Sequence, residues 1–240
     1  RLDILQTKCQ VIFEPTLMPN SKPNKEEIFV AITFFDFKSA PSPRRARILL
    51  AEKGIDVEIV QIDMMKAEQL SDDYRKINPG CTIPALKLED GTILTENAGI
   101  AAWAEAYKPE PSLLGNTPGE KGLVATWNAK VEFEGLMAVA EALRNSSPGM
   151  ADRAITGPIN YVQIPELAAR GKERLIHFMD TLNERLEGRD YIATDQFTFA
   201  DITALVTVDF AKWVKVEPGE NHGNIKRWHA AVKARPSARA

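Results

Sequence analysis

The chain has 240 residues, which is enough for one or two domains with a buried core. It is 44% hydrophobic and 26% charged with a formal net charge of −3, values that fit a globular enzyme or binding protein and exclude a general nucleic-acid or membrane-surface binder. Its three histidines and two cysteines show no metal-ligand spacing, no apolar run is long enough to span a membrane, and the low cysteine count favours a reducing cytoplasm.

Residues 1–28 differ in character from the rest of the chain. They lack the compact apolar core of a signal peptide, and the stretch PNSKPNKEE is polar and contains proline. We expect this segment to be an N-terminal extension or leader and assign it no function.

Two strands and a helix are predicted next. ITFFDF at residues 32–37 is a short apolar run rich in β-formers, and VEIVQI at residues 57–62 alternates. Between them a helix is expected to begin with Ser42 as its N-cap and to end at Gly54. Two strands joined through a helix lie parallel, so these two strands should form a parallel pair.

An antiparallel hairpin is predicted by the pair Asp90-Gly91 between two short apolar runs, because glycine accepts a positive φ at little cost. A helical stretch at residues 66–77 precedes it, and a helix from Glu96 follows it. The resulting order β-α-β-α-β-β-α is that of a thioredoxin-like α/β domain with a mixed four-stranded sheet, which we place at residues 29–108.

An all-α domain is expected at residues 119–240, after a proline-bearing linker at residues 109–118. Its first helix should span residues 119–145, with Gly135 marking a bend or a close approach to a neighbour. The side chains expected on the buried side of this helix are Leu123, Trp127, Val131, Met137 and Leu143.

The central helix of the second domain is expected to begin at Thr198. Thr198 and Asp201 have the spacing of a capping box, and Phe197 and Ile202 that of a hydrophobic staple. The helix beyond this start is apolar nearly all round, which is typical of a helix that is buried on every side.

Pro84 is the first candidate for a binding role. A trans peptide bond at the first residue of a strand is the ordinary interpretation. A cis bond would instead turn the backbone of Ile83 outward, where its N–H and C=O could pair with an extended peptide. Cys81, a lone thiol nearby, is interpreted as a small structural residue.

Glu96 and Asn97 stand where a strand runs into a helix. Helix capping alone would explain them. Alternatively, the free N–H groups of the helix start attract a ligand carboxylate while Glu96 takes up an ammonium group beside it. A ligand with both groups on one carbon is the α-amino acid end of a molecule.

Ser42, with Ser39 before it, lies where the first strand leads into the first helix. A plain N-cap is one interpretation. The other is a thiolate stabilised at this helix start by the dipole, by a hydroxyl donor and by the positive charges of Arg44, Arg45 and Arg47. These arginines could equally form a solvated helix face.

Taken together, INPGCTIPAL, DGTILTENAGI and FTFADI resemble the motifs of the soluble glutathione transferase family, in the right order over residues 29–240. The likeness is greatest to bacterial members similar to the zeta, theta and tau classes. The resemblance implies a thioredoxin-like glutathione-binding domain followed by a helical domain.

The resemblance also implies roles for five residues. Ile83, before a cis Pro84, would pair with the cysteinyl unit of glutathione, and Glu96 with Asn97 would hold its γ-glutamyl end. Asn97 replaces the usual serine of that pair, but its amide can still donate and accept. Gln69 matches the glutamine that zeta-like members place near glutathione, and no metal is implied.

The expected position of the activating side chain departs from the family. Ala40 stands where related classes carry serine or cysteine, which excludes a cysteine mechanism at that position. Ser42 is therefore the proposed catalytic residue, Ser39 is the second choice, and a backbone N–H at the helix start is a third possibility.

The function that follows is a cytoplasmic, homodimeric detoxification enzyme that conjugates glutathione, its co-substrate, to a small hydrophobic electrophile seated between the domains. A non-catalytic ligand-binding protein and a specialised glutathione-dependent lyase, isomerase or dehalogenase are the alternatives. Trp127, Trp213 and Phe133 are aromatic residues that either line that electrophile pocket or belong to the core.

Overall fold

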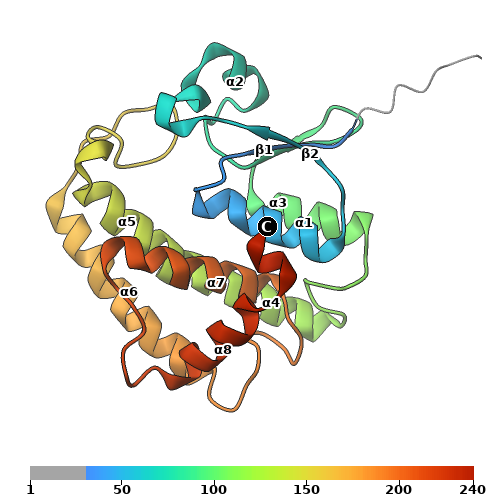
Figure 1. Ribbon diagram of the computed structural model, residues 1–240, viewed down its shortest axis with the longest axis vertical. Helices are drawn as coiled ribbons and strands as arrows, with labels where there is room; N and C mark the ends of the chain where they lie inside the picture. The colour runs from blue at the N-terminus through green and yellow to red at the C-terminus, as the bar shows by residue number, and fades with distance from the viewer. Residues whose placement is uncertain (1–30) are drawn as a thin grey trace, which may run out of the picture.

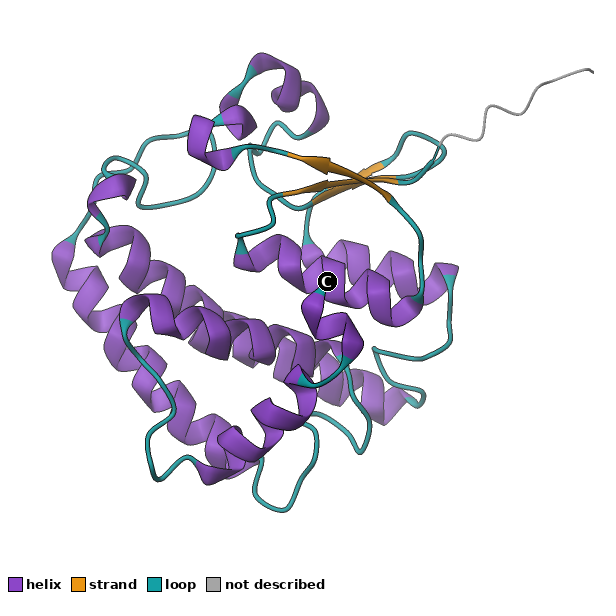
Figure 2. Ribbon diagram, viewed as in Figure 1, coloured by secondary structure: helices purple, strands orange, loops and turns teal. Residues whose placement is uncertain are grey.

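The computed structural model describes residues 31–240, so the extension expected at residues 1–28 lies outside the described residues. A small sheet lies above two nearly parallel helices, α1 (Pro41–Lys53) and α3 (Asn97–Tyr107), and the remaining long helices form a bundle on the other side of α1 (Figures 1 and 2). The predicted fold class, a thioredoxin-like α/β domain followed by an all-α domain, is confirmed.

The sheet has four strands in the order β2-β1-β3-β4. β1 (Thr33–Asp36) pairs in parallel with β2 (Glu58–Gln61) and antiparallel with β3 (Ala85–Lys87), which pairs antiparallel with β4 (Ile93–Leu94). The predicted parallel pair and the predicted hairpin are therefore both present, and the turn glycine between β3 and β4 has the positive φ of 86° that this turn requires.

β1 is buried on both faces. Phe34 belongs to the main apolar core with α1 and α3, whereas Phe35 points to the opposite face and packs with Ile62 and Tyr74. Successive side chains of a strand alternate between faces, so two consecutive phenylalanines require cover on both sides of the sheet.

The start of α1 differs from the prediction by two residues. The helix begins at Pro41, and Ala40, not Ser42, occupies the N-cap position without a side-chain hydrogen bond. Proline suits the first helical position because its fixed φ is already helical and its missing N–H has no partner there. The predicted end is correct, since Gly54 closes the helix at φ 56°.

The stretch predicted as helical at residues 66–77 is broken into three pieces. Two 3-10 turns, Met64–Lys66 and Glu68–Leu70, precede the short helix α2 (Asp72–Ile77). Ser71 caps α2 by accepting a hydrogen bond from Tyr74 N at 3.2 Å, which restarts the helix there.

The helix predicted at residues 119–145 is continuous but irregular. α4 (Pro118–Lys130), which Thr117 caps, runs through a π-helical turn (Val131–Leu136) into α5 (Met137–Ser146). A π-helical turn contains an extra residue and so rotates the following side chains around the axis.

That rotation accounts for an error in the predicted core. Val131 is buried as expected, but Met137, which follows the π-helical turn, is 52% exposed. Leu123, which precedes it, is 46% exposed in the single chain.

Gly135 marks a close approach between helices, as predicted. A Cβ atom on it would lie 2.7 Å from Phe178 Cε1 of α6 (Pro165–Arg185) and 2.9 Å from Thr207 Cγ2 of α7 (Phe199–Ala211). Three helices therefore meet where only a hydrogen atom fits.

α7 is the buried central helix, as predicted. Thr198 N donates to the Asp201 carboxylate at 2.9 Å, and the capping box is complete. Trp228 of α8 (Gly223–Lys233) and the Ile192 N–H also donate to Asp201, each at 3.0 Å. Asp201 is fully buried, and burial raises its pKa to about 6.

Short 3-10 turns complete the described chain at Pro148–Met150, Lys212–Val214 and Pro236–Arg239. None of the helices within residues 31–240 combines the length and apolar character needed to cross a bilayer.

We predict that Gly135→Ala lowers the free energy of unfolding. The added methyl group must displace the Phe178 ring or the Thr207 methyl group, and overpacking of this kind costs ~1–3 kcal/mol. This cost opposes the helix-propensity gain of about 1 kcal/mol from replacing glycine. Chemical denaturation of both proteins measures the difference.

Gly122→Ala is the matched control, because Gly122 lies in α4 with open space around it. This variant should gain about 0.5–1 kcal/mol from helix propensity alone. An equal stabilisation by both substitutions would contradict the close packing at Gly135.

Candidate functional site

The turn between β1 and α1 is fixed by a buried carboxylate. Asp36 is 1% exposed and accepts from Arg47 Nη1 at 2.5 Å and from Gln61 Nε2 at 2.8 Å. Gln61 Oε1 in turn accepts from the backbone N–H of Lys38 at 3.1 Å, and Arg47 Nη2 donates to the Lys38 carbonyl at 2.9 Å. The backbone leading into α1 is therefore held by side chains of β1, β2 and α1.

The first turn of α1 offers a single free backbone donor, the N–H of Ser42. A helix leaves its first four N–H groups without partners inside the helix. Here Ala40 N donates to the Phe37 carbonyl at 2.9 Å, and Pro41 and Pro43 have no N–H. The positive end of the helix dipole is thus concentrated at Ser42.

The side chain of Ser42 is held from α3. Asn97 Nδ2 donates to Ser42 Oγ at 3.0 Å and to the Ser42 carbonyl at 3.2 Å. Within residues 31–240 the Ser42 hydroxyl accepts this bond and donates none, so its hydrogen remains available. Asn97 is 5% exposed, and its buried Oδ1 atom has no hydrogen-bond partner in the described part of the chain.

The loop at residues 78–84 is shaped by its own side chains. Asn78 Nδ2 donates to the Thr82 carbonyl at 2.8 Å, and Asn78 Oδ1 accepts from Gly80 N at 2.9 Å. Cys81 is 2% exposed with φ 52°, the left-handed region that favours glycine. This is the position where the resembling motif has glycine, and the buried thiol fits the structural role expected for it.

The Ile83–Pro84 peptide bond is cis. The trans bond that proline statistics favour is therefore wrong here, and the cis bond implied by the family resemblance is correct. The N–H and C=O of Ile83 make none of the turn, loop or cap hydrogen bonds of the described chain. Ile83 also packs in the same apolar cluster as Ala40, which brings the loop beside the start of α1.

Glu96 and Gln69 have opposite surroundings. Glu96 is exposed and is the N-cap residue of α3, and within residues 31–240 its carboxylate makes no capping hydrogen bond. Gln69 is 7% exposed, and its buried Oε1 atom accepts no hydrogen bond from residues 31–240. The Gln69 side chain is therefore buried rather than solvated.

The three arginines of α1 are neither a solvated face nor free to face a thiolate. Each is bound to a carboxylate, and two of those carboxylates belong to the helical domain. The partners are Asp209 for Arg44, Glu132 for Arg45 and Asp36 for Arg47.

Of the three aromatic residues that would either line an electrophile pocket or belong to the core, two are largely exposed and one packs against the core. Phe133 is 69% exposed and Trp213 is 55% exposed. Trp127 is partly buried against the core, with the Arg185 guanidinium 4.8 Å from its ring centroid.

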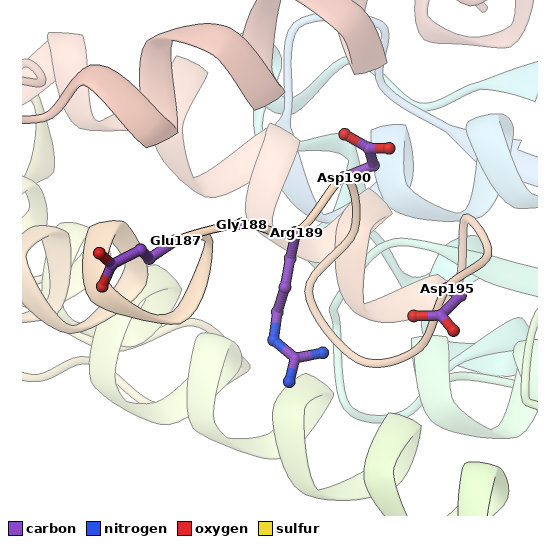
Figure 3. A pocket seen from close by; sticks show the side chains of 5 residues that line it. All are labelled: Glu187, Gly188, Arg189, Asp190 and Asp195. Atoms are coloured by element: carbon purple, nitrogen blue, oxygen red, sulfur yellow. The ribbon is translucent and has the colours of Figure 1, made fainter.

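A hollow of about 410 Å³ lies in the loop after α6 (Figure 3). Its carboxylates and its guanidinium point in different directions rather than toward a common centre (Figure 3). The lining residues are Glu187, Gly188, Arg189, Asp190 and Asp195, none of which is a predicted site residue. In the part of the chain that the structure describes, no three His, Cys, Asp or Glu side chains are grouped to hold a metal ion.

The geometry therefore brings Ser42 and Asn97 into direct contact and sets the loop with Ile83 beside them. The link between Asn97 and Ser42 was not foreseen from the sequence. The two residues are 55 positions apart, and no local pattern signals such a bond.

Two family models match the chain. The model for the N-terminal domain of glutathione S-transferase matches residues 40–106, and the model for the C-terminal domain matches residues 148–236.

Individual relatives match over most of the chain. Glutathione S-transferase 2 of Saccharomyces cerevisiae is 31% identical over 217 residues, which cover 89% of this chain and 91% of the relative. A solved glutathione S-transferase domain-containing protein of Marinobacter aquaeolei is 34% identical with a TM-score of 0.79, covering 85% of this chain and 98% of that one. Maleylacetoacetate isomerase of Rattus norvegicus is 27% identical over 72% of this chain and 74% of its own. By sequence and by structure, this chain belongs to the soluble glutathione S-transferase family of enzymes.

Proposed function

We propose that the protein conjugates the thiol of glutathione to a small hydrophobic electrophile. The observation that carries the proposal is the start of α1, where one backbone N–H and one hydroxyl with a spare hydrogen both belong to Ser42. Such a site stabilises an anion through the helix dipole and two hydrogen bonds. A thiolate is the anion that the family chemistry requires.

Activation of the thiol rests on Ser42. A free cysteine thiol has a pKa near ~8.5, and a helix N-terminus lowers it. The N–H of Ser42 contributes from the backbone, which explains how Ala40 can stand where related classes carry a polar side chain. Asn97 orients the Ser42 hydroxyl by donating to its oxygen, so that the hydrogen points away from α3.

Glutathione binding is proposed for the surrounding residues. The free N–H and C=O of Ile83, next to Pro84, would pair with the cysteinyl backbone as in an added strand. The carboxylate of Glu96 and the unpartnered Oδ1 of Asn97 would accept from the γ-glutamyl ammonium group. The unpartnered amide oxygen of Gln69 would accept from a further N–H of the tripeptide.

The proposal includes a cytoplasmic homodimer with a role in detoxification. Leu123, Phe133 and Met137 leave large apolar surfaces exposed along α4, the π-helical turn and α5, and a second copy of the chain would cover them. Cys81 is a buried thiol without a disulfide partner among residues 31–240, which is consistent with a reducing compartment.

A glutathione-dependent isomerase is the second candidate, because maleylacetoacetate isomerase of Rattus norvegicus is among the relatives. An isomerase regenerates glutathione, whereas a transferase consumes it. Measuring free thiol during turnover of an electrophile panel separates the two, and retention on immobilised glutathione without any turnover would indicate a binding protein.

We predict that Ser42→Ala lowers kcat and leaves the affinity for glutathione nearly unchanged. Losing a hydrogen bond to a charged group costs ~1.5–3 kcal/mol, which corresponds to a rise of about one to two units in the pKa of the bound thiol. The pKa is read from the thiolate absorbance of the binary complex as a function of pH.

Ser39→Ala is the control for Ser42→Ala, since Ser39 is exposed in the turn before α1. It should leave kcat and the thiol pKa unchanged, and Ser42→Thr should restore much of the lost activity. An unaltered kcat in Ser42→Ala would remove the hydroxyl from the mechanism and leave the backbone N–H as the donor.

We predict that Glu96→Ala weakens glutathione binding about tenfold, at the lower end of the range for a hydrogen bond to a charged group, because Glu96 is exposed. The rate at saturating glutathione should change little, and calorimetric titration measures the affinity. Glu89→Ala removes an exposed carboxylate from the nearby hairpin turn and serves as the control. Equal affinities in both variants would show that the γ-glutamyl end binds elsewhere.

We predict that Asn97→Ala raises the thiol pKa by less than Ser42→Ala and has no effect on that pKa once Ser42 is alanine. The reason is that Asn97 acts on the thiol through the Ser42 hydroxyl. The double-mutant cycle in thiol pKa measures this coupling. Additive pKa shifts would mean that Asn97 acts on the sulfur independently of Ser42.

A further inference from the structure

The loop at residues 147–164 connects α5 to α6 and is fixed in place by hydrogen bonds. Gln163 Nε2 donates to the carbonyls of Arg144 and Ser147, both at 2.7 Å, and Asn145 Oδ1 accepts from Ile164 N at 2.9 Å. Further along, backbone hydrogen bonds of 3.0 Å tie Tyr161 to both sides of Arg153. The loop therefore has a defined shape rather than a variable one.

This loop reaches from the helical domain to the proposed glutathione site. In Figure 1 it is the yellow to gold segment that crosses toward α2. Gly157, at its tip, is buried with φ 114°, and a Cβ atom on it would lie 3.6 Å from the carbonyl oxygen of Gly80. Gly80 belongs to the loop at residues 78–84, which ends at Ile83 and Pro84.

Two arginines donate hydrogen bonds to the backbone of this loop: Arg153, which is part of it, and Arg144, near the end of α5. Arg153 Nη2 donates to the Gly157 carbonyl at 2.8 Å and Arg153 Nη1 to Asn160 Oδ1 at 3.1 Å. Arg144, on α5, reaches the Ile155 carbonyl only at 3.5 Å, and its Nε atom is buried with no hydrogen-bond partner. The partners of both side chains are neutral.

Neither guanidinium forms a salt bridge within residues 31–240. Glu141, one turn before Arg144 on α5, is already bound to Arg170 and Arg174 of α6. Asp152, next to Arg153 in the chain, is exposed and pairs with neither arginine in the described structure.

This arrangement costs free energy as it stands. Burial lowers the pKa of Arg144, and the positive charge of Arg153 lowers it further. A guanidinium cannot release its proton in a protein, so the charge remains. Buried charges are normally paired, and an arginine has the donor geometry for a carboxylate. An anion between the two side chains would offset both the desolvation and the repulsion.

We propose that Arg144 and Arg153 bind a carboxylate carried by the electrophile, so that the second substrate has an acidic group; an unsaturated ketone with a carboxylate serves as the test case. This inference rests on the proposed function and narrows its substrate class. Both arginines follow α4 in the sequence and belong to the helical part of the chain. Every residue proposed to hold glutathione lies between residues 42 and 97, in the first domain. The position of Gly157 beside the Gly80 carbonyl shows that the tip of the loop that contains Arg153 lies next to the loop that ends at Ile83 and Pro84.

The chemistry is a conjugate addition. The glutathione thiolate forms a C–S bond to the carbon β to the ketone, and the π pair of the alkene moves onto the ketone as an enolate. A proton from water then restores the ketone, so that no oxidant or reductant is needed. The carboxylate takes no part in bond making and serves only to hold the alkene in place.

The test uses trans-3-benzoylacrylic acid and its methyl ester, which differ by one charge. For each compound, kcat/KM is divided by the rate constant of the uncatalysed reaction. This ratio should be higher for the acid than for the ester. Arg144→Gln and Arg153→Gln should each lower kcat/KM for the acid about tenfold to a hundredfold, which is the range for losing a hydrogen bond to a charged group. The kcat/KM for the ester should change little in either variant. Arg189→Gln removes an exposed arginine from the loop after α6 and should change neither value.

The carboxylate of glutathione itself is the other possible source of the anion. If it occupied this site, both variants would raise KM for glutathione equally with the acid and with the ester, which would overturn the proposal. Unchanged kinetics for both compounds would overturn it as well.

A binding measurement keeps the inference separate from the proposed function. The glutathione conjugates of the acid and of the ester are titrated into the unaltered protein, which needs no turnover and no folded variant. The acid conjugate should bind at least tenfold more tightly, with the advantage shrinking as salt is raised. Equal affinities would refute the carboxylate site, whereas tight binding of the acid conjugate without any catalysis would refute only the transferase activity.

Discussion

The arrangement of the two domains depends on one buried guanidinium. The side chain of Arg45 is 2% exposed and makes a two-pronged contact with Glu132 at 2.9 and 3.1 Å, while its Nε donates to Thr203 Oγ1 at 3.2 Å. The Phe199 ring lies below the guanidinium, 5.4 Å away. The Glu132 side chain is 40% exposed, but the guanidinium is not, so removing Glu132 would leave a buried charge without its partner. Arg45 follows Ser42 by one helical turn, so the same contact that joins the domains also fixes the proposed catalytic position.

Other charged contacts hold α1 along its whole length. Near its start Arg44 binds Asp209 at 2.8 Å, and near its end Glu52 binds Arg235 at 2.8 Å. The buried ammonium group of Lys53 donates to carbonyls of the segment between the domains. A helix fixed at three points cannot shift to meet a ligand, so its free N–H is already in place before any ligand arrives. Preorganised donors of this kind stabilise a charge without reorganisation at the moment of reaction.

The sequence predicted those features that depend on neighbours in the chain. The parallel strands, the turn at Gly91 and the capping box at Thr198 are local patterns with one physical solution each. The N-cap at Ser42 failed because two prolines, two residues apart, both suit the first helical position, and the pattern could not choose between them. The bond from Asn97 to Ser42 spans 55 residues and depends on how α3 packs against α1, which no local pattern records.

The two halves of the proposed reaction therefore depend on different parts of the chain. On the glutathione side, backbone groups at the start of α1 and in the loop that ends at Pro84 act together with several side chains. The backbone N–H at the start of α1 does not depend on the side chain of Ala40. On the electrophile side the proposed contacts are side chains, Arg144 and Arg153, arranged by a surface loop outside the core. Loops tolerate substitution far better than packed helices. The tip of that loop, at Gly157, lies beside the Gly80 carbonyl, so the two parts of the proposed site meet there.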